Sequence, residues 1–236
     1  MYDVVRPSYL TGLLLISAVC GLVDAACFLA LGGVFAEIMT GNILLLAFRV
    51  GSGKPVDHVT ILRYIEALVA FGVGAFVAGR AVRGDRPLRD RRIVFGIEWA
   101  LVAGATIVVF ATDAGRTGTG RDVAVAALAG AMGMQNAVLR RHGVTDVATN
   151  LMTLTYAGLI ADSSLAGGRN PHWGRRAGSI VVFFVSATVG AFLLRYGAGW
   201  TLLVATVCLG AATLILATTA RVEGPAADDG RAIDLA

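Results

Sequence analysis

Apolar residues fill this chain in eight runs that short polar loops separate, and six of the runs are long enough to cross a bilayer as helices. At 1.5 Å per residue, residues 10–31 cover roughly 32 Å, about the thickness of the hydrocarbon core. The other five predicted spans are 61–79, 93–111, 123–139, 177–194 and 200–217. The pattern therefore predicts a polytopic, all-α membrane protein with about six full transmembrane helices.

Two of the runs are too short to cross comfortably. Residues 34–48 cover only roughly 21 Å and begin directly after Gly32 and Gly33, which favour a break in the helix. Residues 144–160 form a second run that is short and unusually polar. We predict that both are broken or re-entrant helices, because polar groups and irregular backbone at membrane depth usually line a cavity or a protein interior.

The distribution of basic residues favours this topology over one with eight crossings. Residues 80–92 hold six arginines, so this loop is expected to be cytoplasmic. Eight crossings would leave nine of the 20 basic residues inside, whereas six spans with two re-entrant segments leave fourteen inside. The second arrangement follows the positive-inside rule, and it predicts that both termini are cytoplasmic.

Parts of the first half recur in the second half. Gly21-Leu-Val-Asp24-Ala25 aligns with Gly133-Met-Gln-Asn136-Ala137, and Glu37-x-x-Thr40-Gly41 aligns with Asp146-x-x-Thr149-Asn150 at a slightly smaller offset. We expect one transmembrane domain over 1–220, with inverted pseudo-repeats at about 10–111 and 122–218, and a disordered polar tail over 221–236. Inverted repeats with broken helices are a recurrent transporter design.

Composition supports a membrane location and excludes several other classes of protein. Hydrophobic residues make up 56% of the chain, charged residues only 15%, and the mean hydropathy is +0.74. The net charge of +4 comes from arginines in short loops, so it indicates membrane orientation and not nucleic-acid binding. All three cysteines lie inside apolar runs, which argues against a disulfide framework. We expect a bacterial inner-membrane protein.

Polar side chains inside the apolar runs are the candidate functional groups, because such groups are costly in hydrocarbon and usually bind something or pair with something. Asp24 has two interpretations: a carboxylate that binds a proton or cation, or a structural partner of Asn136 or Gln135 in the other half. Thr40, Gly41 and Asn42 offer a hydroxyl, an accessible backbone and an amide, or Gly41 only allows close packing of helices. The full candidate set for a solute or ion is Asp24, Glu37, Thr40, Gly41, Asn42, Gln135, Asn136, Asp146 and Thr149.

Enzyme and metal signatures are missing from the sequence. There is no H-E-x-x-H, no G-x-S-x-G and no P-loop, so we expect no catalysis and no cofactor, and any transport would be secondary or passive. The histidines His58, His142 and His172 lie in loops without a second ligand at metal spacing. Glu66 and Glu98 lie near the ends of predicted spans, where pairing with arginine or a place at headgroup level is expected.

The motif G-x-V-D-A, a following V-F-x-x-x-M-T-G-N block and a later G-x-Q-N-A resemble the YoaK family of small bacterial membrane proteins, whose function is not established. The resemblance covers most of 10–218 and implies a multi-pass membrane fold. It departs in the second half, where a second T-G is expected and Thr149-Asn150 stands instead.

Two hypotheses for function follow from the sequence. The first is a transporter-like or channel-like protein for a small solute or ion. The second is a membrane scaffold or partner subunit in which the intramembrane polar groups only hold the two halves together. Both place the protein in a lipid bilayer, and both are compatible with a homo-oligomer.

Overall fold

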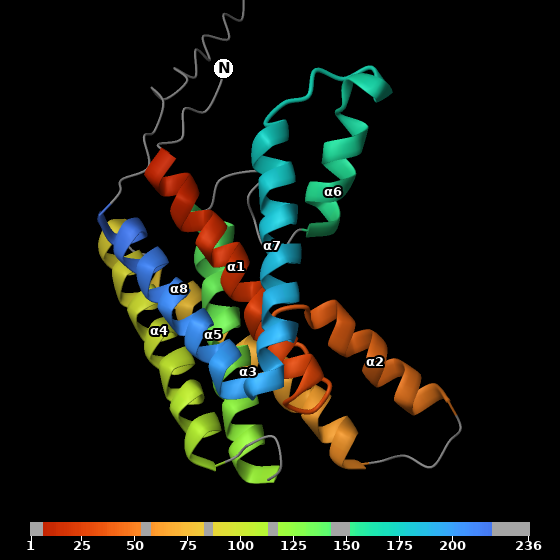
Figure 1. The fold of residues 1–236 in the computed structure, drawn as a ribbon, viewed down its shortest axis with the longest axis vertical. Helices are drawn as coiled ribbons and strands as arrows, with labels where there is room; N and C mark the ends of the chain where they lie inside the picture. The colour runs from red at the N-terminus through yellow and green to blue at the C-terminus, as the bar shows by residue number, and fades with distance from the viewer. Residues whose placement is uncertain (1–6, 53–57, 83–86, 113–117, 143–151, 219–236) are drawn as a thin grey trace, which may run out of the picture.

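Every element that the computed structural model describes is helical, and six of the helices are long and apolar enough to cross a membrane (Figure 1). The described residues are 7–52, 58–82, 87–112, 118–142 and 152–218. The long helices are α1 (Pro7–Leu29), α3 (His58–Ala81), α4 (Pro87–Thr112), α5 (Gly118–His142), α7 (Trp173–Leu193) and α8 (Ala198–Thr218). They confirm the six predicted spans. The predicted tail, residues 221–236, lies outside the described residues.

The remaining elements are short. Helices α2 (Met39–Gly51) and α6 (Met152–Ala161) correspond to the two short apolar runs, and η2 (Ser164–Ala166) and η3 (Leu194–Tyr196) are single 3₁₀ turns. Figure 1 shows that α2 and α6 both begin near mid-height of the molecule and run away from each other, α2 downward and α6 upward.

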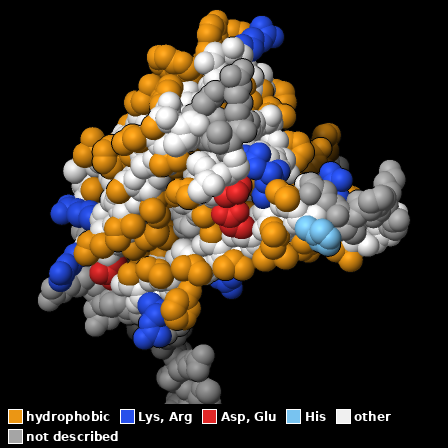
Figure 2. All heavy atoms as spheres, turned by 90° about the horizontal axis from the view of Figure 1, so that it is seen from below, with side chains coloured by type: hydrophobic (Ala, Val, Ile, Leu, Met, Phe, Trp, Pro, Cys, Tyr) orange, Lys and Arg blue, Asp and Glu red, His pale blue; other side chains and the backbone are white. Residues whose placement is uncertain are grey.

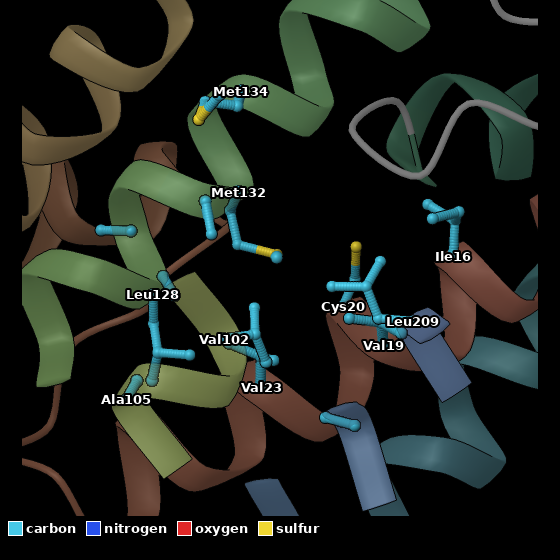
Figure 3. Packing of buried hydrophobic residues seen from close by; sticks show 14 of the residues in the cluster. Ile16, Val19, Cys20, Val23, Val102, Ala105, Leu128, Met132, Met134 and Leu209 are labelled. Carbon is cyan, nitrogen blue, oxygen red and sulfur yellow. The ribbon is translucent and has the colours of Figure 1, made fainter. Parts of the chain in front are cut away.

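The long helices form one bundle whose core lies between α1, α4, α5 and α8. Helix α1 packs against α7 and α8, helix α5 packs against α3 and α4, and α4 packs against α8. Figure 3 shows Cys20 and Val23 from α1, Val102 from α4 and Met132 from α5 gathered at the centre of this core. All four side chains are fully buried.

Close contact between helices depends on small residues, as expected in a membrane where packing replaces the hydrophobic effect. Gly74 and Ala78, one turn apart on α3, form such a contact with α5. A Cβ atom at Gly74 would collide with the carbonyl oxygen of Gly130 on α5, and Ala78 is fully buried.

Large apolar side chains cover the outside of the bundle. Phe76, Ile107, Phe184 and Leu214, from four different long helices, are each 65% or more exposed. Seen from below, hydrophobic side chains cover most of the described surface and surround a small group of acidic and basic side chains (Figure 2). Such a surface suits lipid and not water.

The predicted basic loop 80–92 is mostly helical, which is a correction to the sequence analysis. Helix α3 extends to Ala81 and α4 already begins at Pro87, so Arg91 and Arg92 lie inside α4. Proline suits the first turn of a helix because its missing N–H would have no partner there. The arginines are accommodated by long-range contacts: Arg91 donates to the Tyr9 hydroxyl at 3.2 Å, and Arg92 donates to the Ala217 carbonyl at 2.8 Å.

Candidate functional site

A sharp turn after α1 positions the candidate site. Gly32 and Gly33 have φ angles of +114° and +75°, a region that L-residues with side chains rarely adopt. The turn folds residues 34–38 back beside the last turns of α1. The short helix predicted over 34–48 therefore begins at Met39 and not at Val34.

Asp24 holds this returning segment in place. Its Oδ1 atom accepts hydrogen bonds from the backbone N–H groups of Ala36 at 2.8 Å and Glu37 at 2.9 Å. These amides belong to the irregular segment just before α2, so the carboxyl group from α1 is the acceptor for buried backbone donors that no helix pairs. The partners of Asp24 are thus backbone amides of its own half, and not the side chains of Asn136 or Gln135 that the structural interpretation predicts.

Asn42 closes the same segment from the other side. Its Oδ1 accepts from the Phe35 N–H at 2.8 Å and its Nδ2 donates to the Phe35 carbonyl at 2.7 Å. Gly41 leaves room for this arrangement, because a Cβ atom there would lie 2.8 Å from the Phe35 ring, which stacks on Phe28. Asn42 and Gly41 therefore fix the broken segment, and both have a structural task.

Gln135 and Asn136, the two candidates on α5, have different hydrogen-bond partners. Gln135 is fully buried and its Nε2 donates to the Cys20 sulfur of α1 at 3.0 Å. Asn136 donates to the Met132 carbonyl at 2.9 Å, and its side chain lies close to the carboxyl group of Glu37. Asn136 thus brings the second half of the chain next to the broken segment of the first.

A cavity of about 360 Å³ lies where the starts of α2 and α6 meet the middle of the bundle. Three of the predicted site residues line it, namely Glu37, Thr40 and Asn136. The other lining residues are Ile38, Met39, Phe71, Met152, Thr153 and Phe183. Asp24, Gly41, Asn42 and Gln135 are not among the lining residues, and Asp146 and Thr149 lie outside the described residues. Among the described candidates, Asp24, Gly41 and Asn42 therefore hold the segment 34–38 in place, and Gln135 contacts Cys20. Glu37, Thr40 and Asn136 line the cavity.

Glu37 is the chemically unusual member of the lining. Its exposed fraction is only 7%, and its Oε1 atom has no hydrogen-bond partner within the part of the chain that the structure describes. A buried carboxyl oxygen without a partner is costly unless a proton or a ligand satisfies it. Glu37 is therefore the group in this cavity that is best placed to bind a proton, a cation or a hydrogen-bond donor.

The candidate set from the sequence does not include Met152 and Thr153, two lining residues at the start of α6. Met152-Thr153 at the start of α6 repeats Met39-Thr40 at the start of α2, at nearly the same offset that relates Gly133 to Gly21. The alignment made from the sequence instead placed Thr149 opposite Thr40. The repeated Met-Thr dipeptide was the available signal, and it pairs residues that the structure brings to one cavity.

The comparisons with known proteins identify the family. A family model described as a protein of unknown function, DUF1275, matches residues 12–215. The chain belongs to the DUF1275 family. It is also 28% identical over 154 residues to the UPF0700 transmembrane protein YoaK of Bacillus subtilis (strain 168), an alignment that covers 64% of this chain and 66% of that protein. No solved structure matches the chain.

This DUF1275 protein also buries a carboxylate that the sequence analysis misplaced. Glu98 is fully buried near the middle of α4, and neither carboxyl oxygen has a hydrogen-bond partner among the described residues. The error follows from the position of the helix start: because α4 begins at Pro87 and not at Ile93, Glu98 lies deep in the span. Glu98 does not line the cavity.

Charged side chains of this DUF1275 protein also gather near the glycine turn. The Nε atoms of Arg63 from α3 and Arg121 from α5 lie 3.8 and 3.3 Å from Oδ1 of Asp122. Glu66 is close enough to interact electrostatically with all three side chains. The expected pairing of Glu66 with arginine stays a prediction, because the described contacts of Arg63 and Arg121 go to Asp122. In the described residues, no group of three His, Cys, Asp or Glu side chains is arranged to hold a metal ion.

Proposed function

We propose that this protein is a secondary or passive transporter of the bacterial inner membrane, with the cavity between α2 and α6 as its solute site and both termini in the cytoplasm. The observation that carries the proposal is the position of Glu37, a buried and incompletely paired carboxyl group on the wall of a cavity inside a membrane bundle. Intramembrane ionisable groups of this kind are rare and usually functional.

The pattern of helix packing supports two pseudo-repeats. If α1 to α4 are exchanged with α5 to α8, the contacts of α1 with α7 and α8 become those of α5 with α3 and α4. The contact of α2 with α3 likewise becomes that of α6 with α7, and the contact between α4 and α8 is unchanged. This exchange is expected of a repeat that relates the two halves.

The contacts of two glycines also support this relation. A Cβ atom at Gly21 of α1 would lie 2.7 Å from the Phe183 carbonyl and 3.0 Å from the Ala187 nitrogen of α7. A Cβ atom at Gly133 of α5 would meet the Phe71 carbonyl and the Ala75 nitrogen of α3. The offset between each residue and its counterpart is constant, as the predicted repeat requires.

The arrangement of the short helices supports alternating access. Because α2 is too short to cross, α1 and α3 are connected on one side of the membrane, so α5 runs opposite to α1 and the repeats are inverted. Half-helices that begin near mid-height in both halves are the feature that secondary transporters use to build a central site. The cavity lies at the starts of both half-helices.

The scaffold hypothesis explains only part of the polar centre. It accounts for Asp24 and Asn42, whose hydrogen bonds fix the broken segment. It does not account for the cavity or for the unpaired oxygen of Glu37. We therefore favour transport.

Flux into proteoliposomes tests the proposal. Vesicles with purified protein are given labelled neutral, anionic and cationic solutes, and the uptake rate is compared with that of empty vesicles. We expect uptake of at least one class. Thr153→Leu, which places a larger apolar side chain in the cavity, is expected to slow uptake by about tenfold or more.

Thr188→Leu is the matched control. Thr188 is exposed on α7, and its hydroxyl donates to the carbonyl of Phe184 in the same helix. Uptake by this variant is expected to equal that of the wild type. If no solute enters faster than into empty vesicles, or if both threonine variants behave alike, the transport proposal is wrong.

A further inference from the structure

Among the described lining residues of the cavity, Glu37 is the only ionisable side chain. The other lining residues are neutral and include two threonines, one asparagine, two methionines and two phenylalanines. A confined site with one acidic group and no basic group attracts positive charge and repels negative charge. The sign of the charge on the wall therefore favours a cation.

The start of α2 does not reverse this preference. Helix starts usually attract anions because their N–H groups point outward without partners. Here Asp24, whose Oδ1 accepts from the amides of Ala36 and Glu37 directly before α2, already brings a carboxyl group of the protein itself close to this end of the helix.

The remaining wall is suited to an organic cation and not to a bare metal ion. Phe71 from α3 and Phe183 from α7 both line the cavity, and aromatic rings attract ammonium groups electrostatically. Met39 and Met152 add polarisable thioethers that adapt to alkyl groups. The oxygen ligands of a metal ion must lie directly around it, whereas a volume of about 360 Å³ leaves far more space than one ion fills and is at the low end of small-molecule sites.

We propose that the cavity binds a small organic ammonium ion, with its charged nitrogen at the carboxylate of Glu37 and its alkyl part between Phe71 and Phe183. The hydroxyls of Thr40 and Thr153, one from each half, accept hydrogen bonds from the same ammonium group. This inference rests on the proposed function, because it names the substrate class of the same cavity.

Ligand-induced stabilisation tests the inference without transport. The full-length protein in detergent is titrated with methylammonium and ethylammonium chloride at constant ionic strength, and with potassium chloride and sodium acetate for comparison, while Tm is followed. Ligands that bind the folded state raise Tm with concentration. We expect the organic ammonium ions to raise Tm and the other salts to leave it unchanged.

Two variants make the test specific. Glu37→Gln is expected to weaken the apparent affinity about tenfold or more, because it removes the charge that pairs with the ligand. Glu66→Gln, the same change outside the cavity, is the control and should retain the wild-type affinity. Phe183→Leu keeps Glu37 and should weaken affinity by about three- to tenfold, so it decides the question even if Glu37→Gln does not fold.

The inference is overturned if no ammonium ion raises Tm, if potassium raises it equally, or if the ammonium effect survives in both cavity variants. Its failure is distinguishable from failure of the proposed function. A protein that carries only a neutral or anionic solute in the flux assay keeps the proposed function and loses this inference. A protein that binds ammonium ions but moves no solute keeps this inference and loses the proposed function.

Discussion

Replacing Gly133 with alanine is expected to lower the free energy of unfolding by about 3 kcal/mol, because the added methyl group would collide with the backbone of α3. The new Cβ would meet the carbonyl oxygen of Phe71 and lie 3.0 Å from the Ala75 nitrogen, and backbone atoms inside a helix cannot move aside cheaply. Gly21→Ala is expected to have a loss of similar size, since its Cβ would meet the equivalent atoms of α7.

Thermal or denaturant unfolding of the detergent-solubilised protein measures both losses. Gly104→Ala in α4 is the control, because a Cβ there would contact nothing within 4 Å. It is expected to be neutral or to stabilise the protein by up to about 1 kcal/mol through helix propensity. If Gly133→Ala and Gly21→Ala are as stable as Gly104→Ala, the close contacts of α5 with α3 and of α1 with α7 are not as described.

Replacing Asp24 with alanine is expected to cost about 4 kcal/mol of stability, because two buried backbone amides lose a charged acceptor. The amides of Ala36 and Glu37 have the Asp24 carboxylate as their acceptor, and the space between α1 and the returning segment is buried. We expect hydrogen exchange to become faster in residues 32–42, and Tm to fall.

Asp162→Ala is the matched control for this change. Asp162 pairs with Arg176 at the turn between α6 and α7, and its side chain is 45% exposed. Because water reaches the Asp162 carboxylate, this ion pair is expected to contribute only about 1 kcal/mol, far less than the expected loss at Asp24. A fully stable Asp24→Ala protein that has lost uptake would show instead that Asp24 belongs to the solute site. It would contradict the structural role of Asp24 as acceptor for the amides of Ala36 and Glu37.

The sequence was sufficient to predict the spans because length and hydropathy alone decide whether a helix can cross hydrocarbon. From the sequence, α4 is expected to begin at Ile93, because a cluster of arginines is typical of a loop. In the structure α4 begins at Pro87, and the long side chain of Arg91 reaches Tyr9 from within the helix. Glu98 therefore lies near the middle of α4 and not near the end of a span, where the sequence predicts it.

The sequence predicts which residues belong to the polar centre, but not which of them hold the broken segment and which line the cavity. Asp24 and Glu37 are both acidic residues in an apolar stretch. Nothing in their local sequence distinguishes a residue that binds backbone amides from one that lines a cavity. The distinction depends on the turn at Gly32 and Gly33, which returns backbone amides to Asp24 and leaves Glu37 on the cavity wall. The two glycines predict a break in the helix, but the direction in which the chain leaves the turn depends on packing, which hydropathy does not encode.

The most direct test of the central claim is whether the cavity can be reached from both sides of the membrane. Thr153→Cys protein in oriented vesicles is treated with a membrane-impermeant thiol reagent from one side and then from the other, with Thr188→Cys and wild type as controls. We predict modification of Thr153→Cys from either side and none of Thr188→Cys, which faces lipid. Modification from one side only, or from neither, would contradict transport through this cavity.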